Sequence, residues 1–527
     1  MKKIITTLTL GLFLTVQYTI AQINFSEHIA PIIYENCTSC HRTGEIAPFA
    51  LETYEDAAAF SQMIKYVTGI RYMPPWKPDR NFSEFLGERY LTEAEIQMIA
   101  EWADAGAPQG NPDLAPPVPN FPSGSALGTP DLVLSFSESY EHQGNMQDNY
   151  RVFVLPTGLT EDKEIAAVEV RPGNAKIVHH ALIAYDDSGQ GQALDDATPE
   201  YGYDGFGGFG VNGVFDKQFP GYVPGQRPRF FQNELGQLLP AGSDLLVQMH
   251  YGPFPTTETD SSSINIFFKD EPVERYVEQF VMLPFGGILT NGPFFMPANT
   301  VKTFHGVVTI PTKTSILGIA PHSHLLGQDW TVYMVHPNGD TTNLISIPEW
   351  DFNWQGGYWF KKFMIAEAGS QIHAYATYDN TSENPFNPNN PPQSVTWGEQ
   401  TTDEMYYLPL MYVPYAAGDE DVVFDDNLTA TEEDFQLVTL DNKMYPIFPN
   451  PAANEVIIGF SLASRSPLDI EVLDLQGKTV ANIAQNQLYL SGYHQVKWNA
   501  AGVPNGVYII NVRGEGFVLS EKISVVE

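Results

Sequence analysis

The chain has 527 residues, which is enough for several domains, and 43% of them are hydrophobic. It carries 63 acidic and 27 basic residues, for a formal net charge of -36. Nucleic acid and anionic lipid partners require basic surface, so this acidity argues against both. Beyond the N-terminus no stretch approaches the ~20 apolar residues of a membrane span, and we expect no transmembrane anchor.

A secretory signal peptide is predicted over residues 1–21. Lys2 and Lys3 precede an apolar run from Ile4 to Val16, and small residues follow up to Ala21. We therefore expect an exported protein whose mature chain begins after this segment.

Both cysteines of the chain fall in one Cys-x-x-Cys-His motif at residues 37–41. This is the attachment pattern of a c-type haem, in which Cys37 and Cys40 form thioether links and His41 ligates the iron. A redox disulfide is the alternative reading. The strand-then-helix setting of such a disulfide is missing here, and a redox disulfide would leave the adjoining His41 without a role.

Helical signals surround this motif. Ser26 is expected to cap a helix over residues 27–35, and a capping box from Thr92 to Glu95 is expected to open a helix that runs to about Ala105.

With the motif, these helices make residues 22–110 resemble a small all-α cytochrome c domain. The resemblance implies a second axial iron ligand, and Met73 is the predicted one because it lies in a proline-stiffened loop between helices. Met63 and Met98 are rivals, but both lie in predicted helices, where packing is the default role.

Residues 111–129 are rich in Pro, Gly and Ser and are predicted to form a semi-rigid linker. Short apolar runs then alternate with turn signals, as in all-β sandwiches, for example at residues 150–155 and 264–268. The stretches Tyr201–Gly225 and Asp379–Pro392 are too glycine-rich or too polar for strands. Each is either the mouth of a substrate cleft or a surface insertion.

A His-x-His pair and a methionine stand out in the second half of this region. On a strand His322 and His324 share a face, so two imidazoles are aimed at one point, which makes half of a copper or zinc site. Such a pair is also often structural. A thioether at Met405 would favour Cu(I) over zinc, although a single Met is more often a core residue.

Three further histidines lie upstream. His179 and His180 are neighbours on a predicted strand and would point to opposite faces, so they can share a metal only through a local bulge or twist. Otherwise one of them is a core residue. His250 follows a turn at residues 240–242 and ends another predicted strand. Six other histidines are interpreted as structural. His28 and His142 lie near the ends of predicted elements, and the other four have no partner at ligand spacing: His305, His336, His373 and His494.

In this order the elements resemble the copper type II ascorbate-dependent monooxygenases, the family of peptidylglycine alpha-hydroxylating and dopamine beta-monooxygenases, over about Pro130–Tyr412. The resemblance implies two tandem jelly-roll-like β-sandwiches, at residues 130–285 and 286–417, with one copper ion each. It implies an electron-storing copper and a catalytic copper that binds O2. The ligands would be His179, His180 and His250 for the first, and His322, His324 and Met405 for the second.

The chain departs from the peptide-hydroxylating members at three positions. Ala320 stands where they place an Arg, and Tyr407 and Pro409 stand where they place an Asn and a Tyr. Those residues anchor a substrate carboxylate in the family. We therefore expect a small, non-peptide substrate without a carboxylate anchor.

Acidic residues are concentrated at residues 418–440, which are predicted to form a second linker. Residues 441–527, with alternating strands at 468–472 and 506–512, resemble the type IX secretion sorting domain, an immunoglobulin-like β-sandwich. The resemblance implies transport across an outer membrane by the type IX secretion machinery, to the cell surface or the medium. A carbohydrate-binding or stalk sandwich is the alternative, but no cluster of aromatic residues indicates a sugar platform.

The predicted protein is thus a secreted monooxygenase with two copper ions and one covalently attached c-type haem. It is expected to hydroxylate a C–H bond of a small molecule with O2, and its electrons are expected to come through the haem from an external reductant or electron-transfer partner. The alternative is a secreted electron-transfer or copper-binding protein without hydroxylase turnover.

Overall fold

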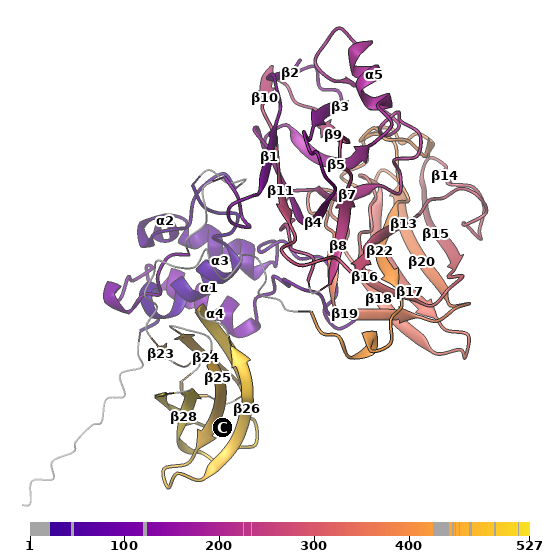
Figure 1. Ribbon diagram of the computed structural model, residues 1–527. Coiled ribbons are helices and arrows are strands. Elements are labelled where there is room, and N and C mark those ends of the chain that lie inside the picture. Colours follow the sequence, from indigo (N-terminus) through magenta and orange to yellow (C-terminus); the bar gives the residue numbers. More distant parts are fainter. Residues whose placement is uncertain are drawn as a thin grey trace, which may run out of the picture.

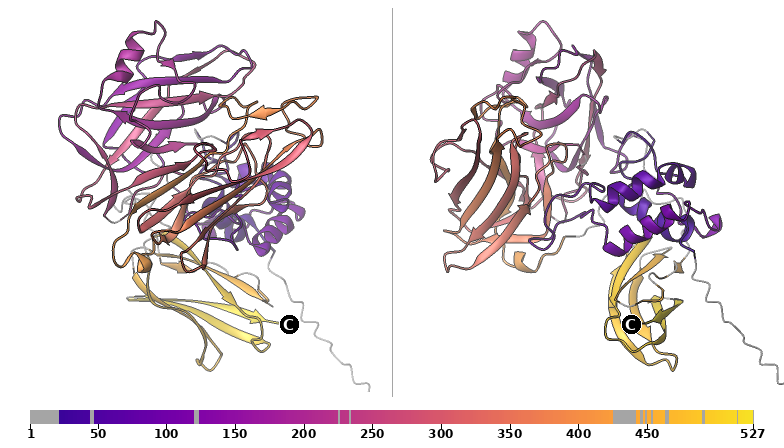
Figure 2. Two further views of the ribbon diagram at one scale, coloured as in Figure 1. Left: turned by 90° about the vertical axis from the view of Figure 1, so that its right-hand side faces the viewer. Right: turned by 180° about the vertical axis from the view of Figure 1, so that it is seen from behind.

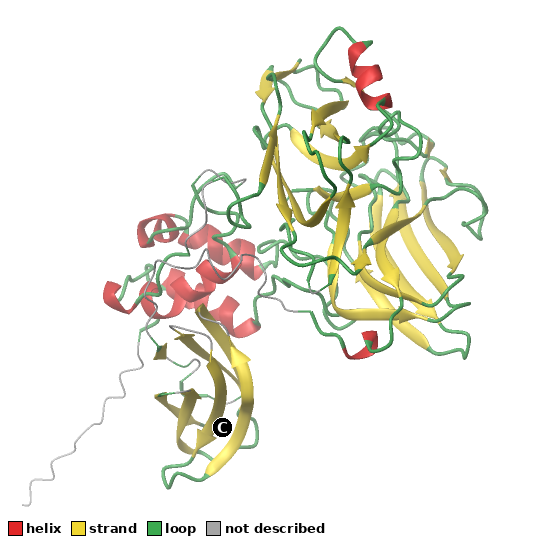
Figure 3. Ribbon diagram, viewed as in Figure 1, coloured by secondary structure: helices red, strands yellow, loops and turns green. Residues whose placement is uncertain are grey.

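The computed structural model shows a helical unit, two large β-sandwiches and a smaller C-terminal sandwich (Figures 1 and 3). The described residues are 22–43, 47–119, 124–224, 226–232, 234–424, 442–444, 447, 450–452, 454–462, 466–489, 492–514 and 516–526. The predicted signal peptide lies outside them. No helix within these ranges is long and apolar enough to cross a membrane.

The helical unit contains the Cys-x-x-Cys-His motif and packs around a small apolar core that includes Ile29, Ile33 and Trp102. The capping box predicted at Thr92 is present, since Thr92 and Glu95 bind each other's backbone N–H groups. The cap predicted at Ser26 is wrong: the side chain of Asn24 accepts from the N–H of Glu27 instead. The helices are η1 (Phe25–Ile29), α1 (Ala30–Asn36), α2 (Tyr54–Ala59), α3 (Ser61–Gly69), α4 (Glu93–Asp104) and η2 (Pro112–Leu114).

The first sandwich consists of two five-stranded sheets, in the orders β1-β11-β4-β8-β12 and β6-β3-β9-β5-β7, with β10 paired to β2. Its elements are β1 (Leu132–Ser135), β2 (Tyr140–His142), β3 (Asn149–Pro156), β4 (Lys163–Arg171), β5 (Val178–Asp186), α5 (Gln190–Asp196), β6 (Tyr203–Asp204), β7 (Gln218–Tyr222), β8 (Leu235–Leu239), β9 (Asp244–Tyr251), β10 (Glu258–Asp260), β11 (Ser263–Phe268) and β12 (Arg275–Tyr276).

The expected strands at residues 150–155 and 264–268 correspond to β3 and β11. The stretch from 201 to 225 was not expected to hold strands, yet it contains β6 and β7. Glycine is needed within β7 because a Cβ at Gly221 would lie 2.3 Å from the carbonyl oxygen of Ala181. A glycine-rich composition here reflects close backbone packing and does not exclude pairing.

The second sandwich has two four-stranded sheets, in the orders β13-β22-β16-β19 and β15-β20-β17-β18, with β14 paired to β21. Figure 2 shows the ribbon from two further sides. Its first strand pairs with its last, so this sandwich begins at Glu278 and not at the predicted 286. Its strands are β13 (Glu278–Met282), β14 (Phe295–Met296), β15 (Thr300–Thr309), β16 (Thr314–Ile319), β17 (Gly327–Val335), β18 (Thr341–Ile347), β19 (Tyr358–Ala366), β20 (Gln371–Asn380), β21 (Val395–Thr396) and β22 (Leu408–Pro414).

The second linker begins later than predicted, because residues 418–424 pack on both large sandwiches. The short helix η3 (Asp419–Asp421) places a buried Asp419 against the guanidinium of Arg275 on β12 of the first sandwich, with N–O distances of 2.7 and 2.8 Å, and the hydroxyl of Ser315 on β16 of the second sandwich donates to the same carboxylate. Phe424 packs edge-on against Phe363. Residues 425–441 lie outside the described residues.

The C-terminal sandwich has a three-stranded sheet, β23-β24-β27, and a four-stranded sheet, β26-β25-β28-β29. The expected strands at 468–472 and 506–512 correspond to β25 and β28. Its strands are β23 (Lys443–Met444), β24 (Glu455–Leu462), β25 (Ser466–Leu473), β26 (Thr479–Tyr489), β27 (Gly492–Asn499), β28 (Gly506–Gly514) and β29 (Phe517–Val525).

The helical unit is docked on the second sandwich by the segment at residues 79–88, which follows α3. Phe85 is 1% exposed and belongs to the core of that sandwich, where it stacks on Phe360. The backbone N–H of Leu86 donates to the carbonyl oxygen of Trp359 over 2.7 Å, and that of Asp79 donates to Ser346 over 2.8 Å. The helical unit is therefore fixed by core packing and does not depend on the linker alone.

The predicted linker at residues 111–129 is also partly packed. Ser125 donates from its hydroxyl to the buried carboxylate of Glu169 over 2.6 Å, and the N–H of Ala126 donates to the same group over 2.7 Å. Leu127 is buried against the first sandwich. Residues 120–123 lie outside the described residues.

Removing the Phe85 ring tests this docking. We expect Phe85→Ala to lower the free energy of unfolding of the second sandwich by about 3–5 kcal/mol, because a buried aromatic ring is replaced by a cavity. Chemical denaturation followed by tryptophan fluorescence measures the loss. Phe386→Ala is the matched control, since Phe386 is 64% exposed. Equal stability of the two variants would contradict the docking.

Candidate metal centre

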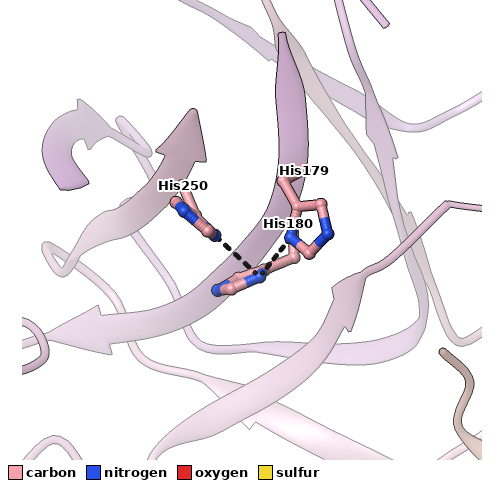
Figure 4. Close-up of side chains that lie close together, drawn as sticks. All are labelled: His179, His180 and His250. Carbon is pink, nitrogen blue, oxygen red and sulfur yellow. Dashed lines mark hydrogen bonds between the residues drawn. The ribbon is translucent and has the colours of Figure 1, made fainter. Parts of the chain in front are cut away.

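His179, His180 and His250 converge because of an irregularity in β5. In the pairing of β5 with β9, Val178 lies opposite Tyr251 and His180 lies opposite His250, so His179 is an extra residue in the strand. Such a bulge turns a side chain that would otherwise point to the other face. The three imidazoles therefore lie together, as Figure 4 shows.

The spacing of the three nitrogen atoms suits a metal ion. The Nδ1 atoms of His179 and His180 are 3.3 Å apart, and those of His180 and His250 are also 3.3 Å apart. Two imidazole nitrogens that each lie ~2.0 Å from one ion at a near-tetrahedral angle are about 3.3 Å from each other. All three ligand atoms lie within 4.8 Å of one another.

His250 is oriented by two neighbours on β3 and the turn before it. Its Nε2–H donates to Asp148 over 2.8 Å, which leaves the Nδ1 lone pair free to bind a metal. The ring of Tyr150 stacks on the imidazole with centroids 4.2 Å apart. Asp148 also accepts from the hydroxyl and the N–H of Thr401, over 2.7 and 2.9 Å. Because Thr401 belongs to the second sandwich, this carboxylate links the first metal-ligand set to the other domain.

His322 and His324 were expected on a strand. They lie instead on the connection between β16 and β17, which forms a single β-bridge. His322 and Tyr407 pair with each other through both backbone groups. The imidazoles lie on the same side, with ring centroids 5.2 Å apart. The expected convergence of the pair is therefore present although the expected strand is not.

The Nδ1 atoms of this pair face carbonyl oxygens. The Nδ1 of His322 lies 2.6 Å from Oε1 of Gln355, and that of His324 lies 3.2 Å from the carbonyl oxygen of Asp403. Both Nδ1–H groups donate in this arrangement, so both Nε2 lone pairs remain for a metal.

Met405 lies two residues before Tyr407, the bridge partner of His322. The backbones of His324 and Met405 are linked through one side chain, that of Glu404. The buried carboxyl group of Glu404 accepts the N–H groups of His324 and, over 2.8 Å, of Met405. Burial raises the pKa of Glu404 to about 8, which favours the neutral acid near pH 7.

The two ligand sets meet at the interface of the sandwiches. The rings of His180 and His322 have centroids 6.3 Å apart. The ring of Phe352 stacks on His179 at 4.7 Å and meets the face of His324 edge-on at 5.7 Å. Five imidazoles thus form one cluster that draws on both domains.

These imidazoles are neutral at ordinary pH. Burial lowers the pKa of His179 to about 3, that of His322 to about 4 and that of His324 to about 3, and the other imidazoles of the cluster add to the effect. Since a metal binds only the unprotonated ring, the cluster is already in its ligand form.

The haem-attachment motif lies at the end of α1. Cys37 and Cys40 are free thiols. The Nδ1 of His41 lies 3.1 Å from the carbonyl oxygen of Phe49, which fixes the ring and leaves Nε2 for an iron. These residues fit a covalently attached haem.

The three methionines considered as second iron ligands differ in burial. Met73 is half-buried in the loop after α3. Met98 packs in the helical core, and Met63 is 54% exposed. The packing role expected for Met98 is confirmed, that expected for Met63 is wrong, and Met73 stays the predicted ligand.

Sequence reasoning missed the residues that orient the imidazoles, namely Asp148, Gln355 and Phe352. Each lies in a loop and carries no periodic signal. From the sequence, His305 and His373 were also interpreted as lacking a partner at ligand spacing. This was wrong, because they lie on the paired strands β15 and β20 with Nε2 and Nδ1 3.0 Å apart.

Comparison with known families matches residues 446–526 to the secretion system C-terminal sorting domain. The C-terminal sandwich is therefore a type IX secretion sorting domain, and it indicates export across the outer membrane to the cell surface or the medium. No monooxygenase or cytochrome c family model matches the chain. A comparison with curated proteins gives no match.

Among solved structures, a β-glucuronidase of Parabacteroides merdae is 10% identical to this chain, with a TM-score of 0.13. The match covers 43% of this chain and 28% of the β-glucuronidase chain. A Faecalibacterium prausnitzii β-glucuronidase is 11% identical with a TM-score of 0.12, over 43% of this chain and 37% of its own. The chain thus spans well under half the length of both. A structure of PNGF-II is 9% identical, with a TM-score of 0.20, over 54% of this chain and 65% of the PNGF-II chain. Likenesses this low carry no argument about function.

Replacing Asp148 tests the orientation of His250. We expect Asp148→Asn to weaken metal binding at the three-histidine set by about 10–100-fold, because the imidazole loses its charged acceptor. Competitive copper titration of the metal-free protein measures the affinity. Asp187→Asn is the control, since Asp187 pairs with Lys217 on the surface. Equal affinities of both variants and the wild type would show that Asp148 does not support a metal site.

Proposed function

We propose that the protein is a secreted copper- and haem-dependent monooxygenase that hydroxylates a C–H bond of a small molecule with O2. The observation that supports this most is the five-imidazole cluster, in which neutral side chains from two domains converge and three of them have the nitrogen spacing of a metal site. The alternative is a copper-binding electron carrier without turnover, favoured by the missing carboxylate anchor at Ala320.

Copper bound at the two sets would supply the one-electron and O2 chemistry. The overall reaction takes one oxygen atom into the new C–OH bond and releases the other as water, with the uptake of two electrons and two protons. The protein's own part is to keep its ligands neutral and oriented. Asp148, Gln355 and the carbonyl oxygen of Asp403 each engage one nitrogen of an imidazole, so only the other nitrogen faces the cluster.

The aromatic ring of Phe352 lies between the two sets and covers both His179 and His324. We propose that this ring limits the access of water to the space between them, which would protect a reactive centre from side reactions. The rings of Tyr150 and Tyr407 cover the cluster from the two domains.

The proposed substrate is small and lacks a carboxylate. The N–H of Ala320 donates to the carbonyl oxygen of Pro409 over 3.0 Å, so two of the three positions that depart from the peptide-hydroxylating family lie side by side. Neither residue offers the fixed bidentate donor that binds a carboxylate firmly.

The haem is proposed as the electron donor to the copper ions. The helical unit is packed on the second sandwich through Phe85, so the donor is held in place and does not have to diffuse to the centre. Gln355, which binds His322, lies in the loop that faces the helical unit, where Trp354 meets Tyr72 edge-on at 5.9 Å.

Loss of one ligand separates the two metal sets. We expect His324→Ala to bind one copper ion less than the wild type and to keep its haem spectrum, because the imidazole contacts the cluster and not the haem motif. Metal analysis with visible spectra measures both. His336→Ala is the control, since His336 binds Thr342 away from the cluster. A variant that retains two copper ions would contradict the assignment.

Loss of covalent haem tests the donor role. We expect Cys40→Ser to lose covalent haem, to keep both copper ions and to turn over more slowly with the natural reductant, because electrons no longer reach the copper through the haem. Stopped-flow reoxidation of reduced wild-type haem in the presence of Cu(II) and O2 provides the direct observation. Turnover of the variant at the wild-type rate, together with haem that is not reoxidised, would disprove this role.

A further inference from the structure

One loop of the second sandwich touches both the helical unit and the imidazole cluster. It is the connection between β18 and β19, at residues 348–357. Trp354 contacts the helical unit, and Gln355, its neighbour in the chain, contacts His322. Adjacent residues thus link the helical unit to the second ligand set, which is His322, His324 and Met405.

The contact with the helical unit is made by the segment that contains Met73. The ring of Tyr72 meets the indole of Trp354 edge-on, with centroids 5.9 Å apart. The Nζ of Lys77 lies 3.4 Å from a carboxylate oxygen of Asp351, and both side chains are 20% exposed. Because Tyr72 is the chain neighbour of Met73, the predicted iron ligand, the segment that would hold the iron packs directly on this loop.

The contact with the cluster is a hydrogen bond to a fixed side chain. The Nδ1–H of His322 donates to Oε1 of Gln355 over 2.6 Å. The amide of Gln355 is held in place, because its side chain is buried and its Nε2 donates to the carbonyl oxygen of Phe352 over 2.8 Å. The other ring nitrogen of His322 is the one left for a metal, so a single imidazole separates Gln355 from the second ligand set.

The connections from the helical unit to the first ligand set, which is His179, His180 and His250, are weaker. Phe352 of the same loop reaches His179 by ring stacking at 4.7 Å and not by a hydrogen bond. Arg227 donates to Ser39 of the attachment motif over 2.5 Å, but the chain from Arg227 must run back through β7 before it meets β5, which carries His180.

The number of gaps decides between the two ligand sets. Electrons pass between metal centres faster through covalent and hydrogen bonds than across van der Waals gaps. The route through Gln355 has one such gap, between Tyr72 and Trp354. A route through Phe352 has the same gap and a second one, between the stacked rings of Phe352 and His179.

We propose that electrons from the haem enter the metal centre at the second ligand set, through a line of side chains that runs from Tyr72 by way of Trp354 and Gln355 to His322. The inference rests on the proposed function, in which haem and copper are bound, and adds which copper ion is reduced first. Each transfer oxidises Fe(II) to Fe(III) and reduces one Cu(II) to Cu(I), and no bond is made or broken. The first ligand set then receives its electron from the second, across the contact between His322 and His180.

The first test asks which copper ion takes the electron. The full-length protein is loaded with haem and Cu(II) without O2, a laser flash with a photoreductant supplies one electron to the haem, and reoxidation is followed by the visible haem absorption. His324→Ala, with copper only at the first ligand set, should lose this reoxidation. Reoxidation at the wild-type rate in this variant overturns the proposal. A wild-type haem that stays reduced beside Cu(II) contradicts the proposed donor role itself, which separates the two failures.

The second test concerns the route. Tyr72→Leu and Trp354→Leu should each slow the reoxidation several-fold, because the ring contact is lost, while the copper content and the copper EPR spectrum stay as in the wild type. Tyr72→Phe keeps the ring and should keep the rate. Tyr66→Leu is the matched control, since Tyr66 is an exposed tyrosine of α3. If either leucine variant reoxidises its haem as fast as this control, the route through Gln355 is wrong.

Discussion

The structure depends on the burial of five imidazoles where two β-sandwiches meet. Buried histidines of this kind are stable only in the neutral form, since a charge at each would be desolvated beside four others. Neutral rings need their remaining nitrogen lone pairs satisfied, and a shared metal does this for several at once. Three features orient the rings for this: the bulge at His179, the carboxylate of Asp148 and the amide of Gln355.

Contacts between the domains explain why they cannot be treated as independent units. Asp148 of the first sandwich binds Thr401 of the second, and Phe85 of the helical unit completes the core of the second sandwich. Phe85 is buried and the Asp148–Thr401 contact is part-buried, so separating either pair would expose an apolar ring or remove hydrogen bonds from a carboxylate. The export domain at residues 446–526 has two sheets that enclose an apolar core.

The sequence was informative where the signal is local. The capping box at Thr92 and the strands around residues 150–155 follow from short-range patterns, and all of these are present. The bulge that the adjacent His179 and His180 would require is present as well. The orienting residues were not predictable, because Asp148 and Gln355 act on histidines 102 and 33 residues away in the chain. Docking through residues 79–88 was missed for the same reason: the hydroxyl of Ser83, for example, donates to the carbonyl oxygen of Asn343, which is 260 residues away in the chain.

The central claim is that the two histidine sets each hold a copper ion within one interface. X-ray diffraction from copper-loaded crystals, with data on both sides of the copper absorption edge, tests it most directly. The account predicts two anomalous peaks, one among the Nδ1 atoms of His179, His180 and His250 and one beside His322, His324 and Met405. Full copper loading with no peak at either position would contradict it.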